Sequence, residues 1–310
     1  MSNMAPALSV PGMGTFAGFV NPAGQAGKAP WLCSDIQDTL VPPITYESAR
    51  VEAHGQTIPM DDVGGDLVDL VADGENVIAY VADVSGHGLR AGVLMGMTKT
   101  AVRYGLMLGQ PLAKLLDDIN SVLPAVKQPN MFATLAALRF DCSNEVEYIS
   151  AGHVPLLHYR KRNADVVRYS MSQFPLGLFA RTGYASMRIP YEAGDIFALV
   201  TDGVVEIGED QDADFGFERL AQILRDHSQR PLSDIVEAVQ AEVNRHGAQQ
   251  DDQTVLLVRA AGESDPMDHG IVPNWHLVPN WSDTRADGLQ VCEARWQKVL
   301  DELAAHLASE

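Results

Sequence analysis

The chain has 310 residues, 46% of them hydrophobic and 20% charged, which is ordinary for a globular protein of one large or two small domains. Its formal net charge of -19 argues against binding to nucleic acid, because nucleic-acid binders gain most of their affinity from clustered Lys and Arg. No run approaches the roughly 18 apolar residues of a membrane span, and the N-terminus lacks a secretory pattern, so we expect a cytoplasmic protein with no membrane contact.

A tail of 33 residues precedes the expected folded domain, residues 34–260, whose first segment is a short helix. Residues 1–33 are rich in Gly, Pro, Ala and Met, a composition that cannot form a compact core. We expect a flexible tail there, with a partner-binding arm as the alternative. Residues 34–43, SDIQDTLVPP, predict a short helix with Ser34 as its N-cap, which ends at Pro42 and Pro43.

Strand-like and helix-like segments follow in clusters rather than in regular alternation. This pattern favours two stacked, mostly antiparallel sheets with helices packed outside, an α+β fold. The expected strands are Glu47–His54, Leu67–Ala72, Val77–Val84, Met131–Phe140, Val146–Ser150, Met187–Tyr191, Ile196–Val200 and Thr254–Val258. The expected helices are Leu89–Leu108, Leu112–Val122, Phe217–Asp226 and Leu232–Arg245.

The C-terminal part changes character. Residues 261–286 are a turn-rich linker in which VPNW occurs twice, and its tryptophans are expected to pin the linker to the domain, with partner binding as the alternative. Residues 287–310 place apolar side chains at steps of three and four, which predicts a helix with one apolar seam. We expect it to dock on its own domain. The alternative is a homodimer, formed through this helix or through the helix at 34–43.

Aspartates stand at the ends of several expected strands. Asp83 ends the run AYVAD, and Asp202 ends IFALVTD. Asp66 follows two glycines and precedes a strand, and the adjacent Asp251 and Asp252 also precede a strand. Each alone is typical of a turn. If they converge, two charges about 4 Å apart repel by roughly 4 kcal/mol at an effective dielectric near 20, so a cation is needed. Oxygen ligands without nearby Cys or paired His favour Mg²⁺ or Mn²⁺ over zinc.

Eight short motifs occur in the order typical of one protein family. They are GGDLVD, VADVSGHG, FATLAALRF, YISAGHVPLL, FPLGLF, GDIFALVTDGVVE, FGFERL and DDQTVLLV. Together they resemble the SpoIIE-type (RsbU-like) branch of the PPM metal-dependent serine/threonine phosphatases, over residues 36–260. The resemblance implies an α-β-β-α sandwich with two Mn²⁺ or Mg²⁺ ions in a cleft at one end of the sheets.

The same resemblance implies a ligand set for those ions. Asp66 and Asp83 would hold them, with Asp83 bridging and the carbonyl of Val84 assisting. Asp202 and Asp251 would complete the shell of one ion. Water activated by two ions could attack phosphorus directly, which fits a sequence without a credible protein nucleophile.

Two further acids near the expected ligands, Asp252 and Asp69, each have more than one possible role. Asp251 is preferred over Asp252 because the family's D-x-x-T pattern matches Asp251 and Thr254, which leaves Asp252 as a surface or second-sphere group. Asp69 either assists through water or caps a turn.

The histidines of two motifs also have alternatives. His87 either protonates the leaving oxygen as a general acid or belongs to the turn at a helix start. His153, in the AGH motif, is expected to make a structural hydrogen bond. Ser85 is not expected to be a nucleophile, because DVSGH does not match the G-x-S-x-G elbow.

The predicted function is removal of phosphate from phosphoserine or phosphothreonine on a small regulatory protein in bacterial signalling. The resemblance suggests a STAS-type anti-sigma-factor antagonist as substrate, and the helix at 34–43 resembles a segment through which an upstream regulator acts. No arginine dedicated to the phosphate is evident. The alternative is a catalytically weak scaffold that binds a regulatory partner through the C-terminal helix and the VPNW repeat.

Overall fold

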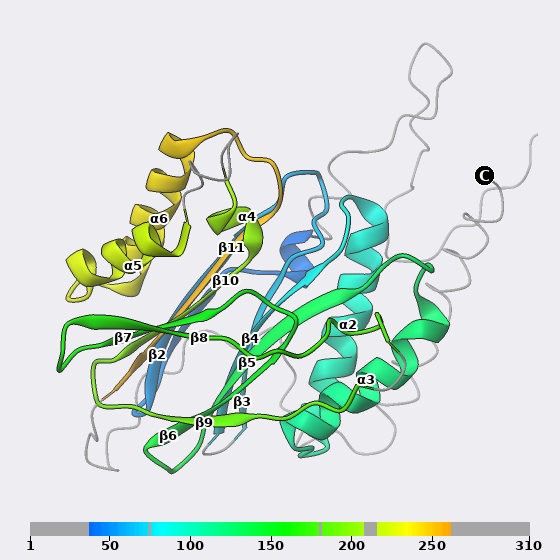
Figure 1. Ribbon diagram of the computed structural model, residues 1–310, viewed down its shortest axis with the longest axis horizontal. Coiled ribbons are helices and arrows are strands. Elements are labelled where there is room, and N and C mark those ends of the chain that lie inside the picture. Colours follow the sequence, from blue (N-terminus) through cyan, green and yellow to red (C-terminus); the bar gives the residue numbers. More distant parts are fainter. Residues whose placement is uncertain (1–36, 74–75, 180–181, 208–215, 262–310) are drawn as a thin grey trace, which may run out of the picture.

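Two antiparallel sheets lie face to face at the centre of the molecule, with helices on both outer sides (Figure 1). The computed structural model describes residues 37–73, 76–179, 182–207 and 216–261. The predicted tail, Ser34, the VPNW linker and the C-terminal helix lie outside the described residues. Of the helix predicted at 34–43, residues 37–43 are described, and 37–40 are helical. In the described ranges, no helix is long and apolar enough to cross a membrane.

Each sheet is built from strands that are distant in sequence. The first has the order β1-β2-β11-β10-β7-β8 and the second β3-β4-β5-β6-β9, with every neighbouring pair antiparallel. The first sheet contains β1 (Ile44–Glu47), β2 (Val51–Ile58), β7 (Leu156–Arg160), β8 (Asp165–Tyr169), β10 (Ile196–Val200) and β11 (Gln253–Ala260). The second contains β3 (Leu67–Asp73), β4 (Asn76–Val84), β5 (Ala133–Phe140), β6 (Glu145–Ala151) and β9 (Met187–Pro190).

The helices form the two outer layers, and their packing on the sheets produces two hydrophobic cores. α2 (Leu89–Met107) and α3 (Leu112–Val126) cover the second sheet, and the larger core joins them to both sheets. α4 (Asp202–Val205), α5 (Gly216–His227) and α6 (Leu232–His246) pack on the first sheet and enclose the second core (Figure 1). The α-β-β-α sandwich predicted from the sequence is therefore confirmed.

Burial on both faces explains why the central strands have nearly continuous apolar sequences. β10 is buried at all five positions, and β4 at all but its first residue and Asp83. A strand between a second sheet and a helix layer has no solvent face, so it cannot alternate apolar with polar residues. Asp83 is the last residue but one of β4, and Asp202 is the second residue after β10, so both stand at the ends of such strands.

Three local expectations differ from the structure. The run Glu47–His54 is not one strand, because the hydroxyl of Ser48 accepts the N–H groups of Arg50 and Val51 and closes a turn between β1 and β2. The hairpin β7–β8 was not predicted, since charged side chains interrupt its apolar pattern. The four-residue α4 is too short to produce a helical period.

Candidate metal centre

The four predicted aspartates come to the same end of the two sheets. In the second sheet, Leu67 pairs with Ala82, so Asp66, just before β3, faces Asp83 near the end of β4. In the first sheet, Val200 pairs with Val255, so the segment after β10, with Asp202, runs beside the segment before β11, with Asp251; a Cβ atom on Gly203 would lie 3.2 Å from the Cβ atom of Asp251. Pairing within each sheet thus places two of these acids at its edge, and hydrogen bonds from Thr201 and Thr254 of the first sheet to Asp66 of the second bring the two pairs together.

Asp66 joins the two sheets at this edge. One of its carboxylate oxygens, Oδ2, accepts hydrogen bonds from the hydroxyls of Thr201 (2.7 Å) and Thr254 (2.6 Å). The hydroxyl of Thr201 also accepts the N–H of Thr254 at 3.0 Å. Asp66 is buried, and burial together with the charge of Asp83 raises its pKa well above the usual value. Sequence reasoning missed Thr201 as a site residue, although it directly precedes Asp202.

The other carboxylates repel one another. Burial raises the pKa of Asp83 to about 7, and the charges of Asp202 and Asp251 contribute to the increase. Burial and the charge of Asp251 also raise the pKa of Asp202. Such mutual effects require that these side chains lie near each other. They are therefore a single electrostatic cluster that is unfavourable when fully ionised.

Two glycines allow the backbone segments of the site to approach closely. A Cβ atom on Gly203 would lie 2.1 Å from the carbonyl oxygen of Asp252, and one on Gly65 would lie 2.6 Å from the carbonyl oxygen of Val84. Both distances are impossible for a real Cβ atom. Only glycine therefore lets the turn after Asp202 and the turn before Asp66 approach their neighbours, and the Val84 carbonyl is part of the same edge.

Asp252 has a structural role that the sequence did not reveal. The surface interpretation was wrong, because Asp252 is only 3% exposed. Its carboxylate accepts the backbone N–H groups of Met60 (2.7 Å), Gly65 (2.6 Å) and Asp66 (3.3 Å). Its own N–H donates to the carboxylate of Asp251 at 2.8 Å. Asp252 thus ties the loop that carries Asp66 to the segment that carries Asp251.

The cluster fits divalent cations in charge and in donor type. In the described part of the chain, no Lys, Arg or His forms an ion pair with Asp66, Asp83, Asp202 or Asp251. Their negative charge is therefore uncompensated, and all the donors are oxygens, which Mg²⁺ and Mn²⁺ prefer. Within the same ranges, no group of three or more Asp, Glu, His or Cys side chains is placed so that it could hold a metal ion. The fit thus rests on charge and donor type, and the ligand assignments stay predictions.

Asp69 does not belong to this cluster, and the expectation that it caps a turn was wrong. It lies within β3, and its carboxylate accepts two hydrogen bonds from Arg103 of α2, at 2.6 and 2.7 Å. Tyr80 donates a third at 2.6 Å, and the ammonium of Lys99 lies 3.6 Å away. Burial opposes ionisation, but Arg103 and Lys99 outweigh it and lower the pKa of Asp69. The residue joins α2 to the sheet.

The two histidines differ in setting. His153 makes the predicted structural hydrogen bonds, with Nδ1 2.7 Å from the hydroxyl of Thr134 in the second sheet and Nε2 2.9 Å from the carbonyl oxygen of Val200 in the first. Burial lowers its pKa to about 4, so it is neutral at pH 7 with Nε2 as the donor. His87 is exposed at the turn after β4 and lies 2.7 Å from Asp61. Its general-acid role stays a prediction.

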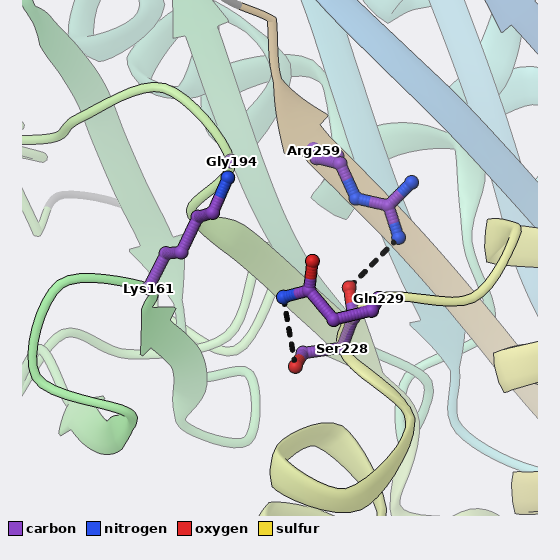
Figure 2. A pocket seen from close by; sticks show the side chains of 5 residues that line it. All are labelled: Lys161, Gly194, Ser228, Gln229 and Arg259. Atoms are coloured by element: carbon purple, nitrogen blue, oxygen red, sulfur yellow. Dashed lines mark hydrogen bonds between the residues drawn. The ribbon is translucent and has the colours of Figure 1, made fainter.

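A pocket at the opposite end of the first sheet is separate from this cluster (Figure 2). It is lined by Lys161, Gly194, Ser228, Gln229 and Arg259. Gly194 precedes β10 and Arg259 lies near the end of β11, whereas the aspartates follow β10 and precede β11. The guanidinium of Arg259 is engaged by Glu52 at 2.6 Å and by the Ser228 carbonyl at 3.2 Å. The pocket therefore contributes nothing to the aspartate edge.

Comparison with known proteins identifies relatives in sequence and in fold. The family model described as Stage II sporulation protein E (SpoIIE) matches residues 73–261. The phosphoserine phosphatase RsbU of Bacillus subtilis (strain 168) is 25% identical over 176 residues, covering 56% of this chain and 52% of RsbU. The chain therefore matches only about half the length of that relative.

Solved structures share the fold. The RsbU and RsbW domains of a Mycobacterium tuberculosis protein superpose with a TM-score of 0.63 at 23% identity, covering 72% of this chain and 62% of that one. The PP2C phosphatase domain of SpoIIE from Bacillus subtilis, with a fragment of its regulatory domain, gives 0.58 at 20% identity, covering 69% and 64%. Both scores indicate that this chain shares its fold with these domains.

Proposed function

Because the chain belongs to the SpoIIE family, we propose that it is a metal-dependent phosphoserine and phosphothreonine protein phosphatase of the bacterial cytoplasm. The observation that carries this proposal is the cluster of four carboxylates without a basic partner at one edge of the sandwich. A structural cluster would be expected to contain Lys or Arg, as the one around Asp69 does. The neighbouring charges help to raise the pKa of Asp66, Asp83 and Asp202, and perturbed carboxylates without a basic partner are typical of a functional site.

The proposed ligands are Asp66, Asp83, Asp202, Asp251 and the carbonyl of Val84, holding two Mn²⁺ or Mg²⁺ ions. When bound, two such ions supply an activated water and neutralise charge on the phosphoryl oxygens. Structures of the same fold support this choice: one is of RsbX in complex with magnesium (TM-score 0.55, 17% identity) and one of PstP in complex with two manganese ions (0.51, 16%).

The chain's own residues would set the geometry of the reaction. Thr201 and Thr254 orient the carboxylate of Asp66 by donating to one oxygen, which leaves the other free for an ion. Asp252 fixes the backbone on either side of the site. These contacts hold the ligands in place before the substrate arrives, which reduces the cost of organising the site in the transition state.

We propose a STAS-type anti-sigma-factor antagonist as the phosphorylated substrate. The support is the similarity to RsbU and to a structure that contains RsbU and RsbW domains. An upstream regulator acting through residues 34–43 belongs to the same proposal. The described end of that segment already contacts the site, because the side-chain oxygen of Gln37 accepts the N–H of Gly64 at 3.2 Å.

The central test is phosphate release by the full chain with Mn²⁺, measured on p-nitrophenyl phosphate and on a phosphoserine peptide. Asp202→Ala should abolish release from both. Asp226→Ala, which removes an exposed aspartate on α5, is the matched control and should retain full activity. Unchanged turnover by Asp202→Ala would reject the site. A wild-type chain that binds Mn²⁺ but hydrolyses neither compound would instead favour the scaffold alternative.

His87 can be tested by the choice of leaving group. A general acid is needed when a serine alkoxide leaves, but not when p-nitrophenolate leaves, because the latter is stable without a proton. His87→Ala should therefore lower kcat on the phosphoserine peptide by about 100-fold and leave p-nitrophenyl phosphate nearly unaffected. Equal effects on both compounds would remove His87 from this role.

A further inference from the structure

Three large apolar side chains are exposed in one loop between β8 and β9. Phe174, Leu178 and Phe179 are 54%, 47% and 50% exposed, and the two phenylalanine rings pack edge to face with centroids 4.7 Å apart. Single exposed apolar residues are common on protein surfaces, but three within six residues form a patch that needs an explanation. We call these three residues the aromatic patch.

The loop is held firmly while it exposes these side chains. The N–H of Gly177 donates to Oδ1 of Asn120 at 2.7 Å, and Nδ2 of the same buried side chain donates to the carbonyl of Phe179 at 2.9 Å. The hydroxyl of Tyr184 donates to the carbonyl of Phe174 at 3.0 Å. The patch is thus preorganised, which lowers the entropy lost when a partner binds.

The aromatic patch also lies beside the aspartate edge. Between its phenylalanines, buried Leu176 exchanges two backbone hydrogen bonds with Ala133, at 2.7 and 3.0 Å. Ala133 is the first residue of β5 and pairs with Val84, the residue that follows Asp83. The loop therefore extends the second sheet beside β5, and β5 is the neighbour of β4, the strand that carries the proposed ligand Asp83.

Charge does not explain how a phosphoprotein would be bound here. The chain has a formal net charge of -19, and in the described ranges no basic side chain forms an ion pair with the four aspartates. Long-range electrostatics would oppose a phosphorylated partner rather than attract it. Affinity must then come from contact area, and apolar groups next to the reacting edge supply it.

Building on the proposed function, we propose that the aromatic patch is the docking surface for apolar residues that flank the phosphoserine of the substrate protein. A substrate that presents its phosphoryl group to the aspartate edge covers the adjoining loop with the neighbouring part of its surface. The patch then selects phosphoproteins with exposed apolar residues near the phosphorylation site and does not contribute to hydrolysis of small phosphate esters.

The test uses the full chain with Mn²⁺ and three compounds. They are p-nitrophenyl phosphate, a phosphoserine decapeptide with leucines on both sides of the phosphoserine, and the same peptide with serines in place of the leucines. The wild-type chain should prefer the leucine peptide by about ten-fold in kcat/KM. The double variant Phe174→Ala, Phe179→Ala should lose this preference and keep its activity on p-nitrophenyl phosphate, which also shows that it folds.

Tyr104→Ala is the matched control. Tyr104 is 59% exposed, but it lies fifteen residues after the start of α2, about 22 Å further along that helix. This variant should keep the peptide preference. A wild-type chain without the preference, or a double variant that retains it, would overturn the inference.

Other occupants of the patch give different results. If residues 1–36 or 262–310 cover it, the double variant should become more active on all three compounds. If a second copy of the chain covers it, the molar mass measured by light scattering should be lower for the double variant than for the wild-type chain. Either outcome would refute substrate docking. If the wild-type chain does not hydrolyse p-nitrophenyl phosphate at all, the proposed function fails. Failure of the docking inference and failure of the proposed function can therefore be told apart.

Discussion

Replacing Asp83 by asparagine should stabilise the metal-free protein and destroy its response to metal. Asp83 is the carboxylate whose ionisation is opposed by burial and by the charges of Asp202 and Asp251. Asparagine has nearly the same shape and no charge. The ionised Asp83 side chain thus lowers the stability of the metal-free fold, but the response to metal should depend on it.

The size of the effect follows from the pKa. A carboxyl with a pKa of about 7 in the folded chain and ~3.9 in the unfolded chain favours unfolding by about 4 kcal/mol once it is ionised in both states. Because this folded-state pKa is raised, the penalty is absent below about pH 4, grows between about pH 4 and 7, and is complete above about pH 7. Local relaxation and water entry reduce it, so we expect about 2 kcal/mol at pH 8.

Urea unfolding measures this directly. In EDTA at pH 8, Asp83→Asn should have the higher free energy of unfolding, and the difference should vanish at pH 4. With Mn²⁺ at a hundred times its dissociation constant, the wild-type chain should gain about 2.7 kcal/mol while the variant gains little. A variant that is less stable than wild type in EDTA at pH 8, or one that keeps the metal response, would refute the electrostatic reasoning.

Three other substitutions test the surroundings of the site. Asp69→Asn should cost roughly 3 kcal/mol at pH 7, because it leaves Arg103 without its buried partner; the depressed pKa of Asp69 means that urea unfolding should show this difference shrinking below about pH 4. Asp252→Ala should cost roughly 3 kcal/mol in the same assay, since three backbone N–H groups lose a charged acceptor, and a loss below about 0.5 kcal/mol would contradict its anchoring role. Gly203→Ala should weaken Mn²⁺ binding about ten-fold in calorimetry, because its Cβ would overlap the Asp252 carbonyl, whereas unchanged affinity would show that the turn can move freely.

The sequence predicts this fold well where its patterns are local. The runs that became β4 and β10 are apolar, bounded by aspartate and long enough to be recognised, and their ends locate Asp83 and Asp202. The hairpin β7–β8 was missed because His158 and Arg160 interrupt its apolar residues. His158 is nevertheless buried, since it pairs with Asp195 at 2.9 Å. A buried polar partner is invisible to a hydrophobicity pattern.

Roles that depend on distant contacts could not be read from the chain. Asp251 and Asp252 are adjacent and chemically identical, yet only Asp252 turns inward to the loop of Gly65, 187 residues away. Asp69 likewise looked like part of the GGDLVD motif, but its partner Arg103 lies on α2, 34 residues later. Short motifs locate the acids, and only the tertiary structure separates those of the carboxylate cluster from those that hold the backbone or a helix in place.

The hydrogen bonds from Thr201 and Thr254 to Asp66 have a consequence for how this protein loses activity. They join residues of the two different sheets, so the carboxylate cluster cannot open unless the two sheets separate. Inactivation by heat or urea should therefore coincide with collapse of the entire domain and not precede it. Amide exchange at Thr254 should be as slow as that of the most protected strand.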